Sequence, residues 1–152
     1  FARESKDFLQ KYFKKELFFT DVEGKTKDEV LKNLCRKVEQ EKGLPETFTA
    51  SVLKREELTP TDYGNLVALP HPERAFQERA FVAVAVLKEP IFWFRQKVQV
   101  VFLTAIGREE DENLQQFYEA TTDLILRPAD VQNLIRHPDY DRLIQLLRRA
   151  EE

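Results

Sequence analysis

The chain has 152 residues, carries a formal net charge of −3 and contains one cysteine, Cys35. This length is typical of a single domain whose core needs no disulfide or metal ion for stability, and one cysteine excludes a disulfide framework within the chain. The 24 basic and 27 acidic residues are interspersed, unlike the basic stripe of a nucleic-acid-binding protein. No apolar run approaches the roughly 20 residues of a membrane span.

These properties predict a cytoplasmic domain that contacts no nucleic acid directly and does not insert into a membrane. The single thiol fits the reducing cytosol. The chain begins at Phe1 and contains no methionine. We therefore expect residues 1–152 to form one domain of a longer, multidomain chain.

The N-terminal part is predicted to be mainly helical. A short first helix carries on one face Phe8, Leu9, Tyr12 and Phe13, and Leu17-Phe18-Phe19 is a short connecting segment or strand. The apolar spacing from Asp28 to Glu41 predicts a second helix that stops at Gly43. Pro45 opens a third helix, which ends near Glu57, and Thr59-Pro60-Thr61 is a turn.

Three strand-like runs and three helices are expected in the rest of the chain. The strands are 66–69, 81–87 and 98–104, and the run 81–87 is apolar on both faces, as in a central strand covered on two sides. The helices are centred on 114–125, 131–135 and 140–147. The predicted fold class is α/β, a mixed sheet of four or five strands flanked by helices on both faces.

His71 is the first candidate for chemistry. It stands between Pro70 and Pro72 directly after a predicted strand, and each proline restricts its own backbone and that of the residue before it. An imidazole titrates near neutrality and can act as a nucleophile or base. The pattern alone leaves a structural histidine beside a turn as an equal alternative.

Other chemistries are poorly supported by the residues. No Gly-x-Ser-x-Gly elbow indicates a serine hydrolase, and His71, His137 and the lone Cys35 lack the spacing of zinc ligands. Cys35 lies on an apolar helix face and is expected in the core. Asp139 is expected to favour the start of the last helix, and Trp93 to pack on the body at the tip of a strand connection.

The segment that ends in His71 carries a more specific pattern. It reads Val52-Leu53-Lys54-Arg55-Glu56, then Thr59-Pro60-Thr61, then Gly64-Asn65-Leu66-Val67-Ala68-Leu69-Pro70-His71. This closely resembles the signature of the fructose/mannitol-type (type 2) enzyme IIA domain of the bacterial phosphotransferase system. The signature has an Arg-Glu pair, a Ser/Thr-rich turn and Gly-x-x-Ala-Ile-Pro-His, and the resemblance extends over nearly the whole chain.

The resemblance implies a phosphoryl relay. The histidine matching His71 accepts a phosphoryl group from the phosphocarrier protein HPr and passes it to enzyme IIB. Arg55 would stabilise the phosphoryl charge with its planar fork, and Thr61 would offer a hydroxyl hydrogen bond. Such transfer depends on positioning and charge neutralisation, so no metal or organic cofactor is expected.

One position departs from the transport members of that family. They carry a second histidine at the start of the helix after the third strand, where this chain has Asn113. Asparagine can hydrogen-bond an imidazole or a phosphoryl oxygen but cannot share its proton. With His137-Pro138-Asp139-Tyr140, this resembles the IIA-like domains at the C-termini of sugar-operon transcription activators and antiterminators.

The leading hypothesis is therefore a regulatory IIA-like domain that is phosphorylated on His71 and controls other domains of a transcriptional regulator. The alternative is an enzyme IIA phosphotransferase of a sugar uptake system. A third reading is a binding module that docks without phosphotransfer.

Overall fold

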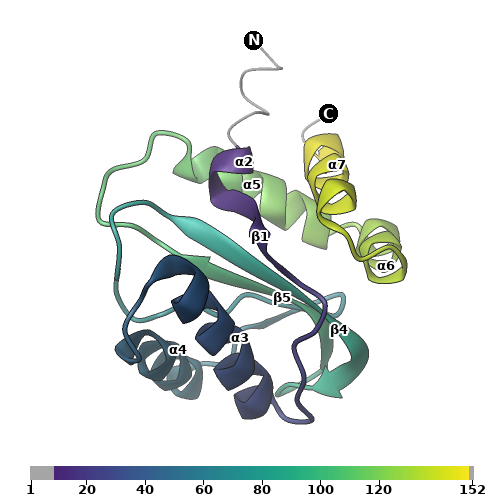
Figure 1. Cartoon of the computed structure of the whole chain (residues 1–152). Coiled ribbons are helices and arrows are strands. Elements are labelled where there is room, and N and C mark those ends of the chain that lie inside the picture. Colours follow the sequence, from purple (N-terminus) through teal and green to yellow (C-terminus); the bar gives the residue numbers. More distant parts are fainter. Residues whose placement is uncertain (1–8, 151–152) are drawn as a thin grey trace.

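The computed structural model describes residues 9–150, which form one mixed sheet with helices on both faces (Figure 1). In chain order the elements are α2 (Leu9–Tyr12), β1 (Phe13–Phe19), α3 (Lys27–Lys42), α4 (Thr47–Leu58), β2 (Asp62–Gly64), β3 (Val67–Ala68), β4 (Phe81–Phe92), β5 (Lys97–Ala105), α5 (Leu114–Ile125), α6 (Pro128–Arg136) and α7 (Tyr140–Ala150).

The five strands lie in the order β1-β4-β5-β3-β2. β4 pairs with β5 in antiparallel fashion, while β1 with β4 and β3 with β5 are parallel pairs, and β2 with β3 is a short antiparallel hairpin. The predicted fold class, a mixed sheet of four or five strands, is confirmed.

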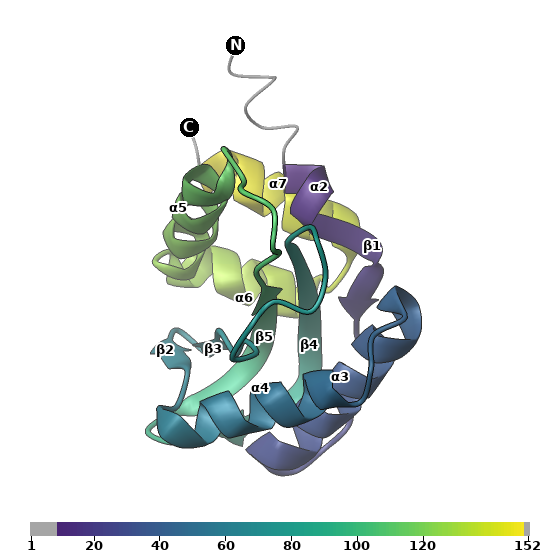
Figure 2. The same cartoon turned by 90° about the vertical axis from the view of Figure 1, so that its left-hand side faces the viewer.

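The two faces of the sheet are buried against different helices (Figure 2). Along β4, Val82, Val84 and Val86 pack in the core with α5, α6 and α7, while the alternating residues pack against α3 and α4. Burying one such large apolar side chain contributes roughly 1.5–3 kcal/mol. The expectation that 81–87 is a central strand covered on both sides is confirmed.

The prediction of where the N-terminal helix ends is wrong. Phe8 lies outside the described residues, α2 is only four residues long, and Phe13 begins β1 instead of continuing a helix. Phe13 pairs with Val82 of β4, and its ring lies 5.7 Å from that of Phe117. Pairing and aromatic packing therefore outweigh the helix-like spacing.

Helices α3 and α4 begin and end close to the predicted positions. Thr26 caps α3 through a capping box with Glu29, and Gly43 ends it at φ 65°. Helix α4 begins at Thr47, two residues later than expected, because Pro45 lies in the preceding turn and its carbonyl accepts the Phe48 N–H.

The predicted strand 66–69 is shorter in the structure. Asn65 and Leu66 have φ of 53° and 69° and form the two-residue turn of the β2–β3 hairpin, which requires left-handed backbone at both central positions. The side chain of Asn65 donates to the Ile125 carbonyl at 2.6 Å. The strand β2 just before this turn was not predicted.

The expectations for Cys35, Asp139 and Trp93 are confirmed. Cys35 is fully buried, and burial raises the pKa of its thiol. Asp139 accepts the Arg142 N–H at 2.8 Å, and Trp93 is buried at the end of β4. Within residues 9–150, no helix has the length and apolar character needed to cross a bilayer.

We expect Gly107→Ala to destabilise the domain by about 1–3 kcal/mol, the usual cost of overpacking. A Cβ at Gly107 would lie 2.7 Å from the Ala80 backbone nitrogen, and backbone cannot yield as a side chain can. Gly43→Ala is the control, because it meets nothing within 4 Å and costs only the left-handed backbone, about 1 kcal/mol. Urea unfolding measures the free energy of unfolding of each variant. Equal values for Gly107→Ala and wild type would contradict the prediction.

Candidate functional site

His71 lies on a segment that the neighbouring strands hold in place. It follows β3, and the carbonyl of Pro70 accepts the Thr104 N–H of β5 at 3.0 Å. On the other side, the Leu69 N–H donates to the carbonyl of Thr61 at 3.0 Å, just before β2. The backbone on the N-terminal side of the histidine is therefore fixed from both flanking strands.

Helix α4 fixes the segment that follows His71. The buried hydroxyl of Ser51 accepts the Glu73 N–H at 2.7 Å. Arg55 lies one helical turn further along α4, and its Nη1 donates to the Thr59 carbonyl at 2.9 Å. The end of α4, β2 and β3 lie on one flank of the molecule (Figure 2). The hydrogen bonds from Arg55 to Thr59 and from Leu69 to Thr61 join the segments that carry Arg55, Thr61 and His71.

The imidazole of His71 is half-buried, and its Nδ1 faces the Leu69 carbonyl at 3.3 Å. A carbonyl can only accept, so this contact assigns the proton to Nδ1. The lone pair of the neutral ring then lies on Nε2.

Thr61 makes a contact that the sequence did not predict. Its hydroxyl donates to Oε1 of Glu56 at 2.6 Å, and its N–H donates to Oε2 of the same carboxylate at 2.8 Å. The hydroxyl proton of Thr61 is thus committed to Glu56 in this structure.

Glu56 is the residue that sequence reasoning missed. It appears in the Arg-Glu pair, but no role was assigned to it. Its side chain is only 2% exposed, and it also accepts the indole N–H of Trp93 at 3.0 Å. A signal was present: Glu56 follows the buried residues Phe48 and Val52 at successive steps of four, which places an acid on an apolar helix face.

Asn113 lies apart from this cluster, beside a cavity of about 530 Å³ whose lining does not include His71. Its N–H donates to Oδ1 of Asp111 at 2.9 Å. Burial and a hydrogen bond with Asp111 raise the pKa of Tyr12, which lines the same cavity. β5 and β3 are neighbouring parallel strands, and Asn113 and His71 follow their carboxyl ends. Both residues therefore lie beyond the same end of the sheet.

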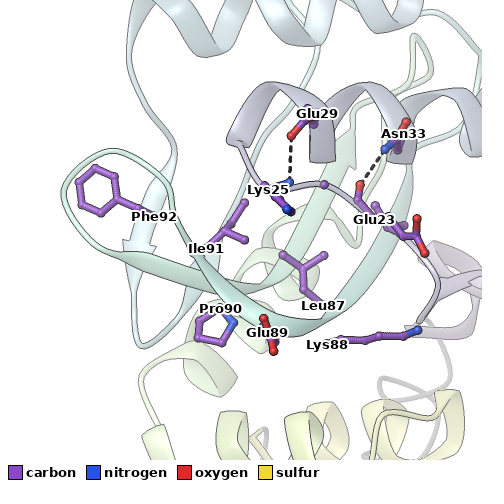
Figure 3. A pocket seen from close by; sticks show the side chains of 12 residues that line it. Glu23, Lys25, Glu29, Asn33, Leu87, Lys88, Glu89, Pro90, Ile91 and Phe92 are labelled. Atoms are coloured by element: carbon purple, nitrogen blue, oxygen red, sulfur yellow. Dashed lines mark hydrogen bonds between the residues drawn. The ribbon is translucent and has the colours of Figure 1, made fainter.

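A second, open hollow of about 890 Å³ lies between the start of α3 and the end of β4 (Figure 3). Two hydrogen bonds join groups of its lining: the Lys25 N–H donates to Glu29, and Asn33 donates to the Glu23 carbonyl. This hollow lies beyond the opposite end of the strands from His71, because β4 runs antiparallel to β3 and β5. In the described part of the chain, no group of three or more His, Cys, Asp and Glu is arranged to hold a metal ion.

Two regulators are among the proteins that this chain resembles in sequence. The chain is 36% identical over 140 residues to the probable licABCH operon regulator and 27% identical over 120 residues to the transcriptional regulator ManR, both of Bacillus subtilis. These matches cover 92% and 79% of this chain but only 22% and 18% of the relatives. The chain therefore spans about a fifth of their length.

Solved structures share the fold. The complex of enzyme IIAMTL and phosphorylated enzyme IIBMTL from Escherichia coli superposes with a TM-score of 0.72 at 18% identity, covering 89% of this chain and 97% of the other. The model of the family described as "Phosphoenolpyruvate-dependent sugar phosphotransferase system, EIIA 2" matches residues 11–150. The chain belongs to this family.

Proposed function

We propose that this domain accepts a phosphoryl group from HPr on Nε2 of His71. The observation that carries the proposal is the placement of His71: Pro70 and Pro72 stiffen its backbone, and β2, β5 and α4 hold the segments on either side. In the transfer, the bond from phosphorus to the carrier breaks as a bond to Nε2 forms. The proton on Nδ1 stays on the ring and faces the Leu69 carbonyl.

Arg55 supplies positive charge to the incoming group. Its guanidinium has five N–H donors, of which Nη1 holds the Thr59 carbonyl, and the remaining donors are suited to bidentate binding of phosphoryl oxygens. Thr61 supports the same site through Glu56, whose carboxylate accepts a hydrogen bond from the Thr61 hydroxyl. No step requires a metal ion or organic cofactor, because phosphoryl transfer between proteins needs positioning and charge neutralisation.

We further propose that the output is regulatory and cytoplasmic. The relatives named as an operon regulator and a transcriptional regulator are several times longer than this chain, so other domains of a parent regulator are the expected partners. Phosphorylation adds about −1.5 to −2 charges, enough to change contacts with a neighbouring domain. The net charge of −3 gives no basis for direct nucleic-acid contact.

The second candidate is onward transfer to enzyme IIB in sugar uptake. The solved complex of enzyme IIAMTL with phosphorylated enzyme IIBMTL supports it. Asn113 disfavours it, because this amide occupies the position that matches the second histidine of the transport members and cannot share a proton as an imidazole can. IIB is therefore a secondary partner in this proposal.

Incubation with phosphoenolpyruvate, enzyme I and HPr is expected to place an acid-labile phosphoryl group on the wild-type domain and none on His71→Ala. His137→Ala is the matched control, since His137 is the other of two histidines and is exposed. Intact-mass spectrometry at neutral pH measures the added mass. Failure of wild type to gain mass, or equal gain by His71→Ala, would overturn the proposal.

Arg55→Ala is expected to slow phosphorylation of His71 by about 10- to 100-fold, the effect of losing charge-assisted hydrogen bonds. Arg55→Lys should recover only part of the rate, because an ammonium keeps the charge but not the planar fork. Lys54→Ala is the control, being the exposed neighbour on the same helix. Rapid-quench kinetics with phosphorylated HPr measures the rates; no difference between Arg55→Ala and Lys54→Ala would exclude the role of Arg55.

A further inference from the structure

Glu56 joins three separate parts of the chain at a single buried carboxylate. Thr61 donates to it with both its N–H and its hydroxyl, at 2.8 and 2.6 Å. Trp93 donates its indole N–H at 3.0 Å, and Nζ of Lys27 lies 3.7 Å from Oε2. A buried carboxylate is costly unless charge and hydrogen bonds compensate it, and here both are present.

The network borders directly on the proposed phosphoryl site. Glu56 is the next residue after Arg55 in α4, and Thr61 accepts through its carbonyl the Leu69 N–H, two residues before His71. The Thr59 carbonyl, in the same turn, holds the guanidinium of Arg55. A turn that is held in place therefore positions both the segment that leads to His71, through Leu69, and the guanidinium of Arg55.

The third arm of the network reaches the connection between β4 and β5. Trp93 is 4% exposed, while its neighbours Phe92 and Phe94 are 63% and 49% exposed. The Arg95 N–H donates to Asp62 of β2 at 2.9 Å. Two hydrogen bonds thus tie this connection to the elements that surround the site.

We propose that Glu56 is a positioning residue for phosphoryl transfer at His71. It holds the turn at residues 59–61 so that Arg55 and the end of β3 keep the geometry the transfer needs. The inference rests on the proposed function and extends it to a residue that touches neither the phosphoryl group nor the imidazole. Because a misplacement of about 1 Å can reduce a rate by about 100-fold, loss of the Glu56 carboxylate is expected to slow phosphoryl transfer to His71.

Chemistry predicts how substitutions differ. Glu56→Ala removes the acceptors of Thr61 and Trp93 together. Glu56→Gln keeps an amide oxygen for the two N–H groups, and its amide N–H₂ can donate to the Thr61 hydroxyl, which turns to accept. Glu57→Ala removes the neighbouring, exposed carboxylate and is the matched control.

The test is single-turnover phosphorylation of the domain by excess phosphorylated HPr. Here kcat is the limiting rate at saturating HPr, and KM is the HPr concentration that gives half of that rate. Glu56→Ala is expected to lower kcat by about 10- to 100-fold with KM for HPr within about twofold, while Glu56→Gln and Glu57→Ala stay within about threefold of wild type. Each variant is assayed well below its own Tm. An unchanged kcat in folded Glu56→Ala would overturn the inference while leaving the proposed function intact, because that function is tested separately by phosphorylation of wild type and His71→Ala.

A double-mutant cycle tests whether Thr61 works through Glu56. Thr61→Val is expected to lower kcat about tenfold, and the Glu56→Ala/Thr61→Val pair to be no slower than Glu56→Ala alone. Additive losses would overturn the inference, because they mean that the two side chains act separately. If Glu56→Ala does not fold, Trp93→Phe replaces it, because this variant removes one hydrogen-bond donor to the same carboxylate. Trp93→Phe is then expected to lower kcat without raising KM. An unchanged kcat in Trp93→Phe would overturn the inference.

Discussion

Strand β4 is buried on both faces, and this burial sets the order of the sheet. With valines facing one set of helices and Phe81, Ala83, Ala85 and Leu87 facing the other, this strand must lie inside the sheet. β5 pairs with it on one side and β1 on the other. The short β2–β3 hairpin is then left at the far edge, where its ends are accessible.

That edge position explains how the fold exposes a histidine without making it mobile. β3 is only two residues long, so the chain leaves the sheet almost as soon as it enters. Hydrogen bonds to Thr61, Thr104 and Ser51 hold the residues around His71 from three different elements. A histidine held in this way suits the proposed transfer between proteins, in which the partner approaches from solvent.

The sequence predicted those features that a local pattern encodes. The two-sided apolar run at 81–87, the stop at Gly43 and the stiff backbone at His71 all follow from residue types and their spacing. Phe13 was misassigned because its spacing from Leu9 also fits a helix, and only pairing with Val82 reveals a strand. The spacing of Glu56 marks it as inward-facing, yet its partner Trp93 lies 37 residues away, a contact that periodicity does not encode.

The proposed function requires that the backbone around His71 presents Nε2 to the phosphoryl donor. Two-bond ¹H–¹⁵N correlation spectra of the phosphorylated, ¹⁵N-labelled domain test this requirement, because they distinguish the two ring nitrogens of each histidine. The expected spectrum has the phosphoryl group on Nε2 of His71, with Nδ1 protonated. Phosphate on Nδ1 of His71, or on His137, would contradict the proposal.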